Sequence, residues 1–407
     1  MMRINLFFLL CIILFVMISC EREPTLEIKF QQADELIEVG LDSLFAGAVL
    51  LVGNQEEILH QQAFGYANRF NERGEVIENP EQMTTEHLFD LASVTKILAT
   101  TYGLMILQDQ GALDVNDPVH KYLPEFETDD KKEITIEYLL RHRSGLMQWF
   151  PSYYVADSPE ERLAFTVSEP LMSAPGMRRY YSDFGFMMLG DVIEKVTGEP
   201  LNEFLAETIY RPMGLTSMVF NPDTTIFSKI AATSHGNPFE KRMVYDDEFG
   251  YTVDVDPQSW NGWREYTLRG EVNDGNAFHT QKGVAGHAGL FSTAEEVYKL
   301  LRVILNDGRF EDGRLFGTET IKLFLQKDEF GHGLGWMMTN TSLHATQLPE
   351  SSFGHTGFTG TNVVVNPENG HIMVFLTNRQ QLGVDEEGHY PNLRQIRENL
   401  SGGVLVD

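Results

Sequence analysis

Cysteine is nearly absent from this sequence of 407 residues, which contains only Cys11 and Cys20. Both lie near the N-terminus, so no disulfide can link segments of the remaining chain. Basic residues are also few: 31 lysines and arginines stand against 59 aspartates and glutamates, which gives a net charge of −28. This balance disfavours nucleic acid, whose phosphates need basic patches, and electrostatic docking on anionic lipid. The composition, 42% hydrophobic and 22% charged, is that of an ordinary soluble globular protein.

An apolar run of 13 residues, Leu6 to Ile18, follows a short start with the single charge of Arg3 and ends just before Cys20. Such a run is too short to span a bilayer but suits the core of a signal peptide. A cysteine at the expected cleavage point resembles a bacterial lipoprotein signal, which implies acylation of Cys20. We therefore predict that residues 1–20 are a lipoprotein-type signal peptide and that the protein is exported and membrane-anchored in the cell envelope. A plain secretory signal or an N-terminal anchor is the alternative, and both also export the protein.

Apolar segments at the two ends of the chain predict two β-hairpins. Residues 45–52 and 56–64 form the first candidate pair of strands, and residues 361–365 and 371–377 form the second. The second pair encloses Asn369-Gly370, a dipeptide that strongly favours a two-residue hairpin turn. Two hairpins from opposite ends can join in one antiparallel sheet.

Helical patterns fill most of the chain between these hairpins and follow the second one. The clearest of them cover residues 133–142, 183–198, 293–308 and 391–400. Strands at both ends with helices between them predict an α+β fold. We expect an antiparallel sheet built from both chain ends, flanked by helices, with an inserted helical subdomain.

One domain is expected to cover residues 21–407. Its sheet layer is assigned to about 40–90 and 285–407, and its helical subdomain to about 91–220. Residues 221–285 are rich in Gly, Asp, Asn and aromatics and show little periodicity. We predict that they form a long loop over the cleft between the two layers, because such loops are usually functional or disordered.

The segment from Leu91 to Leu107 is apolar nearly all round, which is typical of a helix buried on every side. Its one charged residue is Lys96, three positions after Ser93. A cation in the first turn of a helix is disfavoured, and burying it costs more unless it is paired or neutral. Residues at i and i+3 share a helix face, so a neutral Lys96 amine could take the proton of the Ser93 hydroxyl. A simple N-cap role for Ser93 is the alternative.

Two further motifs follow in order: Tyr181-Ser182-Asp183 at a predicted helix start, and His355-Thr356-Gly357 just before a predicted strand. With Ser93-x-x-Lys96 first, the set resembles the serine β-lactamases and penicillin-binding proteins, most closely the class C β-lactamase and esterase branch. Tyr66 and Tyr245 also open similar tripeptides, but order and helical context favour Tyr181. The resemblance covers most of residues 40–380, with further matching stretches at 134–146, 283–297, 331–337 and 374–379.

The resemblance implies roles for these residues. Ser93 is expected to form an acyl-enzyme, with Lys96 and Tyr181 shuttling its proton. The oxyanion hole is expected to consist of the backbone N–H groups of Ser93 and Phe358, the residue after His355-Thr356-Gly357. Tyrosine has a free pKa of about 10, so Tyr181 needs nearby positive charge or a concerted transfer to act as a base.

Two positions depart from the family pattern. Asp183 replaces the usual Asn, and His355 replaces the usual Lys. An ionised Asp183 near Lys96 would hold the lysine charged and shift the base role towards Tyr181. A neutral His355 attracts a substrate carboxylate less than a lysine does. Both changes count against efficient β-lactamase activity, because a β-lactam carries such a carboxylate, as does a peptide ending in D-Ala. They leave an esterase or a specialised peptidase open.

We expect a serine hydrolase that works through an acyl-enzyme without a metal or organic cofactor. Its substrate is a small molecule or peptide with an ester or amide bond. Residues 270–292 look like those of exported hydrolases described as D-alanyl-D-alanine carboxypeptidase-like or as esterases, so a D-Ala peptide from the cell wall is one candidate. A carboxylesterase without a cell-wall role is an alternative, as is a non-catalytic module that binds penicillin or peptidoglycan. A metallohydrolase using His279, His287, His332 and His355 is a weaker alternative, because these histidines lack ligand-type spacing.

Overall fold

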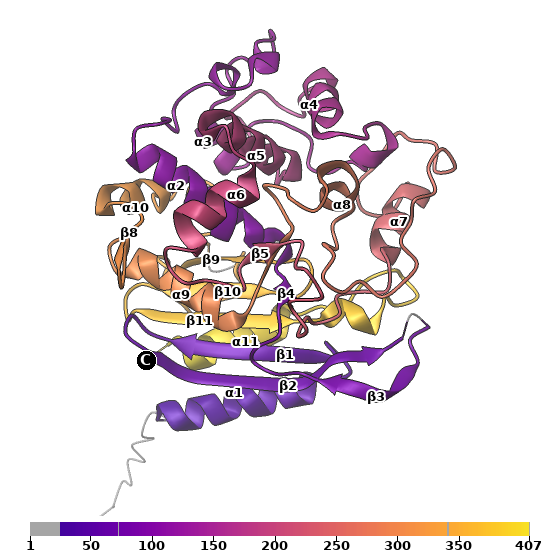
Figure 1. Cartoon of the computed structure of the whole chain (residues 1–407), viewed down its shortest axis with the longest axis vertical. Helices are drawn as coiled ribbons and strands as arrows, with labels where there is room; N and C mark the ends of the chain where they lie inside the picture. The colour runs from indigo at the N-terminus through magenta and orange to yellow at the C-terminus, as the bar shows by residue number, and fades with distance from the viewer. Residues whose placement is uncertain (1–24, 72, 340–341, 407) are drawn as a thin grey trace, which may run out of the picture.

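Strands from the two ends of the chain pair in one antiparallel sheet of order β3-β2-β1-β11-β10-β9 (Figure 1). The computed structural model describes residues 25–71, 73–339 and 342–406. Both predicted hairpins are confirmed, and they meet because β1 pairs with β11. The strands are β1 (Gly47–Gly53), β2 (Ile58–Phe70), β3 (Val76–Gln82), β9 (Phe353–Thr356), β10 (Asn362–Asn366) and β11 (His371–Thr377).

The two faces of this sheet are buried by different helices. Alternate residues of a strand point to opposite faces, so Leu50 and Leu51 belong to separate hydrophobic clusters. The Leu50 cluster includes side chains of α1 (Leu26–Gly40) and α11 (Arg394–Val404), which lie on the outer face. The other cluster includes the helical layer above the sheet (Figure 1). Burial on both faces explains why β1 reads as a continuous apolar run.

The helical layer contains the predicted helices with adjusted bounds. The 183–198 pattern is α5 and ends on Gly198 in the left-handed conformation, at φ 74°. The 133–142 pattern is helical only over five residues, as α3. The described helices of this layer are α2 (Tyr102–Asp109), α3 (Ile136–Leu140), α4 (Pro159–Ser168), α5 (Asp183–Thr197), α6 (Leu201–Leu205), α9 (Ala294–Leu305) and α10 (Thr318–Phe324).

Two small antiparallel sheets accompany the main sheet. β4 (Phe89–Asp90), β6 (Leu290–Ser292) and β5 (Val219–Phe220) form a short antiparallel sheet in that order. β7 (Arg309–Phe310) pairs with β8 (Gly313–Arg314). The β4–β6 pair brings the segment before Ser93 beside the segment after His287.

The segment from Leu91 to Leu107 is not one α-helix. It begins with a 3₁₀ turn at Ala92–Val94, continues as a π-helical turn at Lys96–Thr101 and becomes α-helical in α2. Residues 94–107 are all buried, as the all-round apolar pattern predicted. Mid-helix π turns are frequent at functional sites, which fits the position of Lys96 at the start of this one.

The stretch 221–285 is more ordered than predicted. It contains α7 (Pro238–Tyr245) and α8 (Gly275–Gln281), which the weak periodicity did not indicate. Asp274 caps α8 by accepting the N–H of Ala277 at 2.8 Å, and Pro238 opens α7. Local caps, rather than an apolar period, define these helices.

The predicted signal peptide, residues 1–20 with Cys20, lies outside the described residues. Across the residues that the structure does describe, no helix has the length and apolar character needed to cross a membrane.

Candidate active site

Ser93 lies on a tight turn that leaves β4. The preceding residue, Ala92, has φ 47°, a left-handed conformation that is strained for a residue with a Cβ. The buried carboxyl of Asp90 holds this turn, because it accepts the N–H of Ala92 at 2.8 Å and that of Asn273 at 2.6 Å. Burial raises the pKa of Asp90 to about 6. The strained turn presents the Ser93 hydroxyl to the cleft.

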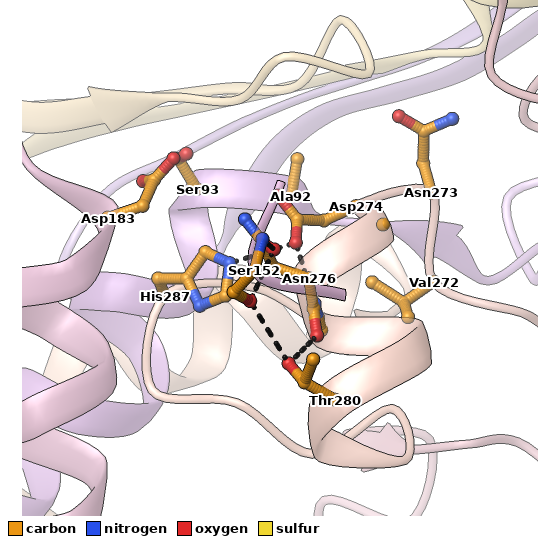
Figure 2. Close-up of polar contacts among 12 residues, drawn as sticks. Ala92, Ser93, Ser152, Asp183, Val272, Asn273, Asp274, Asn276, Thr280 and His287 are labelled. Carbon is orange, nitrogen blue, oxygen red and sulfur yellow. Dashed lines mark hydrogen bonds and ion pairs between the residues drawn. The ribbon is translucent and has the colours of Figure 1, made fainter. Parts of the chain in front are cut away.

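Lys96 is fully buried and its Nζ has three acceptors. The distances are 3.0 Å to Ser93 Oγ, 2.8 Å to Asp183 Oδ1 and 3.1 Å to the backbone oxygen of His287. Burial lowers the pKa of Lys96, but the charges and hydrogen bonds of Asp183 and Tyr181 outweigh it and raise that pKa above its ordinary value. The amine is therefore a charged ammonium. Figure 2 shows the Asp183 carboxylate close to Ser93 on the same side of the site.

Tyr181 completes this group from the start of α5. The side chain of Tyr181 interacts with those of Ser93 and Lys96, and Lys96 Nζ is 5.0 Å from the centre of its ring. The ring packs on His142 with centroids 4.4 Å apart. Burial raises the pKa of Tyr181 above its ordinary value, although Lys96 lowers it. The resting phenol is therefore neutral.

The His355-Thr356-Gly357 motif lies directly against the Ser93 turn. Gly357 approaches so closely that a Cβ at this position would lie 2.6 Å from the backbone oxygen of Leu91. The hydroxyls of Thr359 and Thr361 donate to the backbone oxygens of Asp90 and Leu91 at 2.7 and 2.9 Å. Two segments far apart in the sequence are thus joined at the point where the oxyanion hole was predicted.

His355 lies at the end of β9 and is only 1% exposed. Burial and the charge of Lys96 lower the pKa of His355 to about 3, so its ring is neutral. Its Nδ1 is 2.7 Å from the backbone oxygen of Thr356. The residue that replaces the usual lysine therefore supplies no positive charge.

A pocket of about 430 Å³ opens beside Ser93. Ser93, Tyr181, Asp183 and Phe358 line it, whereas Lys96 and the three residues His355, Thr356 and Gly357 lie behind its wall. The lining includes three acidic side chains and no lysine, arginine or histidine. Its aromatic members are Trp149, Tyr181, Phe239, Tyr251, Phe358 and Tyr390.

Two acidic residues of the pocket were not identified from the sequence. Glu240 of α7 accepts the hydroxyl of Tyr153 at 2.7 Å and the N–H of Gly275 at 3.2 Å. Burial and the neighbouring Asp274 raise the pKa of Glu240 above its ordinary value. For Asp274, burial acts in the same direction, but His287 outweighs it and the pKa is lowered. Only the N-cap pattern before α8 could have indicated Asp274.

The Asp274–His287 pair is connected to Lys96 through the backbone oxygen of His287. Asp274 Oδ1 lies 2.9 Å from His287 Nε2 (Figure 2). The backbone oxygen of His287 accepts from Lys96. Asn276 of α8 binds Ser152 through its Oδ1, which accepts the N–H at 2.8 Å and the hydroxyl at 2.7 Å. These contacts fix α8, and with it the carboxylate of Asp274, against the helical layer.

The four histidines proposed as metal ligands do not form a ligand group in the described part of the chain. His287 pairs with Asp274, and His279 packs with its ring centroid 4.8 Å from that of Trp260. Three ligand-type side chains gather elsewhere, at Asp385, Glu387 and His389, and all three are exposed. Exposed acidic clusters are common on an acidic protein and do not define a metal site.

The Beta-lactamase family model matches residues 33–398. An N-acetylmuramyl-L-alanine amidase of Bacillus subtilis (strain 168) is 33% identical over 384 residues, covering 90% of this chain and 84% of that protein. A protein of Escherichia coli (strain K12), named as an inferred D-alanyl-D-alanine carboxypeptidase, is 33% identical over 387 residues, covering 90% and 86%.

Solved structures agree on the fold. The structure of EstCE1, described as a hydrolase with promiscuous acyltransferase activity, matches with a TM-score of 0.68 at 21% identity, covering 93% of this chain and 99% of that one. The family model and the relatives cover most of the chain, and one pocket is lined by residues of the first two motifs and by Phe358, which follows the third. The chain therefore belongs to the β-lactamase family and is a serine hydrolase of that family.

Proposed function

We propose that this enzyme cleaves an amide bond in a peptide derived from the bacterial cell wall, with Ser93 as the nucleophile. The observation that carries the proposal is the convergence of Ser93, Lys96 and Tyr181 beside a pocket of about 430 Å³. The substrate class is supported by relatives named as an N-acetylmuramyl-L-alanine amidase and a D-alanyl-D-alanine carboxypeptidase. Ester hydrolysis without a cell-wall role is the second candidate, because the same geometry serves both bonds.

Tyr181 is assigned the proton transfer. Lys96 is charged and has no lone pair to offer, so it cannot act as the base while it is paired with Asp183. As Ser93 Oγ bonds to the carbonyl carbon, its proton passes to the Tyr181 oxygen, and the Tyr181 proton passes to the leaving atom. The bond to the leaving group then breaks and frees an amine or alcohol. Water attacks the acyl-enzyme by the reverse transfer, which restores Ser93 and Tyr181.

The negative oxygen of the tetrahedral intermediate is assigned to the backbone N–H groups of Ser93 and Phe358. The close packing of Gly357 on Leu91 supports this assignment, because it brings the segment that contains Phe358 against the turn that contains Ser93. Preorganised donors of this kind typically contribute about 3–4 kcal/mol each to lowering the barrier.

The charge of the pocket bears on the substrate. Asp183, Glu240 and Asp274 line it, and the neutral His355 adds no positive charge. A carboxylate next to the scissile bond, as in a β-lactam or a peptide ending in D-Ala-D-Ala, meets repulsion there. A peptide that presents a free amino group is the better match.

The experiment is a comparison of Ser93→Ala with the wild-type protein. We expect hydrolysis of both a p-nitrophenyl ester and a muropeptide amide to fall by about 10⁴-fold or more in the variant. A fluorophosphonate is expected to add one mass label to the wild type and none to the variant. Unchanged turnover in Ser93→Ala would reject the proposal, and labelling without any turnover would favour the non-catalytic binding module.

We also propose export with lipid attachment at Cys20, which rests on the sequence alone. Labelling of the wild type but not of Cys20→Ala with a radioactive fatty acid would support it. Equal labelling of both would contradict it.

A further inference from the structure

Two arginines without a carboxylate partner lie behind the loop that joins β9 and β10. Arg397 of α11 is only 6% exposed, and Arg379 follows the end of β11. Within residues 25–71, 73–339 and 342–406, the contacts of both guanidinium groups are backbone oxygens and aromatic rings rather than carboxylates. Burying a cation without a counter-charge normally costs several kcal/mol, so this arrangement needs an explanation.

The acceptors of these arginines lie in one short loop. Arg397 Nη2 donates to the backbone oxygen of Thr361 at 3.0 Å and, more weakly, to that of Gly357 at 3.5 Å. Arg379 donates to the backbone oxygen of Phe358 through Nε at 3.0 Å and Nη2 at 2.6 Å. The same loop is tied on its other side to the backbone just before Ser93.

The need for hydrogen bonds to the loop oxygens does not by itself explain why the donors are the charged side chains of Arg397 and Arg379. The amide of Gln380 also reaches the oxygen of Phe358, at 3.3 Å, which demonstrates that a neutral donor fits there. Burial lowers the pKa of both arginines, to about 9 for Arg397 and about 10 for Arg379. The charge of Arg379 adds to the shift of Arg397. If the loop oxygens required only hydrogen-bond donors, neutral side chains could bind them without the mutual repulsion of Arg397 and Arg379.

The peptide geometry suggests what the charge does. The C=O of Gly357 and the N–H of Phe358 belong to one peptide group, so a cation at the oxygen polarises the amide and strengthens the N–H as a donor. Arg379 holds the next peptide group, between Phe358 and Thr359, by donating to the backbone oxygen of Phe358. Both charges lie at backbone oxygens of this loop, where they favour a negative oxygen at the Phe358 N–H.

We propose that Arg397 and Arg379 are positioning residues that orient the two peptide groups of Phe358 and place positive charge behind the oxyanion hole. The inference rests on the proposed acylation of Ser93. It accounts for an active site that is acidic on the substrate side yet must stabilise a negative intermediate.

The test compares Arg397→Gln, which keeps a donor without charge, with Arg397→Lys, which keeps the charge. Arg394→Met is the matched control, because Arg394 lies one turn earlier on α11 and its side chain is 62% exposed. The assay measures kcat and KM for p-nitrophenyl acetate and the inhibition constant of phenylboronic acid, which forms a tetrahedral anion on serine. Melting temperatures report whether each variant is folded.

For Arg397→Gln we expect kcat to fall by about tenfold or more with KM within about twofold, because the lost stabilisation acts on the transition state. The inhibition constant of phenylboronic acid should rise in parallel. Arg397→Lys should retain more activity than Arg397→Gln, and Arg394→Met should match the wild type.

Wild-type kcat and inhibition in folded Arg397→Gln would overturn the inference. Activity in Arg397→Lys no greater than in Arg397→Gln would overturn the part assigned to charge. If the Arg397 variants fail to fold, the same comparison of lost and retained charge is made with Arg379→Gln and Arg379→Lys. Ser93→Ala separates the two hypotheses: an active Ser93→Ala variant rejects the proposed function, whereas an inactive one beside unaffected arginine variants rejects only this inference.

Discussion

Asp183 lies 2.8 Å from Lys96 Nζ, and in the proposed mechanism this ion pair bears on which group accepts the Ser93 proton. Burial favours a neutral Lys96, but Asp183 and Tyr181 together outweigh burial and keep the amine charged. The family's usual Asn at position 183 would remove the largest of the contributions that oppose burial. In the proposed mechanism, the change from amide to acid shifts the base role from Lys96 towards Tyr181.

The first prediction concerns Asp183→Asn. Removing the carboxylate lowers the pKa of Lys96, because the largest contribution that opposes burial is lost. Activity of the variant on a p-nitrophenyl ester should rise with pH as Lys96 loses its proton. The pH profile of the wild type should lack this rise. The measurement is kcat/KM from pH 6 to 10. Asp191→Asn is the control, since Asp191 lies on the same helix and pairs with Arg162 away from the site. Identical pH profiles for Asp183→Asn and the wild type would contradict the assignment.

The second prediction concerns Tyr181→Phe and the leaving group. If Tyr181 passes its proton to the leaving atom, loss of the phenol should harm amides far more than activated esters. We expect about 10²–10⁴-fold lower kcat/KM on a p-nitroanilide, whose amine must be protonated to leave. A p-nitrophenyl ester releases a stable anion and should lose much less. Tyr180→Phe is the matched control on the neighbouring residue. Equal losses on both substrates would exclude this role for Tyr181.

The proximity of Ser93 and Lys96 could be predicted from the sequence because the information is local. Ser93 and Lys96 lie three positions apart, and a lone charge in an apolar segment is conspicuous. The hairpins were predictable for a similar reason, since β1, β10 and β11 are continuous apolar runs and Asn369-Gly370 marks a turn. Hydrophobic periodicity and turn-forming residues can both be recognised within a short stretch of sequence.

Residues that depend on distant contacts were not predictable. Glu240 and Asp274 are polar residues in a stretch with little periodicity, and such residues are usually solvated. Their importance comes from packing against Tyr153 and His287. A capping box at Thr293 is only half formed: Thr293 accepts the N–H of Glu296, but the Glu296 carboxylate accepts from the N–H groups of residues 216 and 217 instead. Donors from a distant segment thus replace the local N–H of Thr293.

The third prediction concerns substrate charge. An alanine p-nitroanilide with a free amino group should have a lower KM than its N-acetyl derivative, and an N-succinyl derivative should have the highest KM. A partly exposed charge pair is worth on the order of 1 kcal/mol, or about fivefold. Glu240→Gln should reduce the spread. Because burial and Asp274 raise the pKa of Glu240, its ionised fraction and the effect of the variant should grow with pH.

Glu265→Gln is the control for this series, because the Glu265 side chain is 79% exposed and does not line the pocket. It removes the same charge from the protein without changing the pocket. A KM order that is reversed, or a spread that shrinks equally in both variants, would show that pocket charge does not set the preference.

The last prediction concerns Gly357→Ala. A Cβ at this position would lie 2.6 Å from the backbone oxygen of Leu91 and 2.0 Å from Thr361 Oγ1. The oxygen of Leu91 belongs to the backbone next to Ser93 and cannot turn aside, so the loop or the nucleophile must move. We expect a loss of about 1–3 kcal/mol in the free energy of unfolding. A larger effect on kcat than on KM should accompany it, because Phe358 shifts with the loop.

Gly403→Ala provides the opposite case in the same protein. Gly403 lies in α11 with no atom within 4 Å of an added Cβ, so alanine should stabilise the helix by about 0.5–1 kcal/mol and leave activity unchanged. Chemical denaturation and ester kinetics on the two variants measure both effects. Full activity in Gly357→Ala would mean that the loop can retreat without disturbing the intermediate. The Phe358 N–H would then have no required position, and the oxyanion assignment would fail with it.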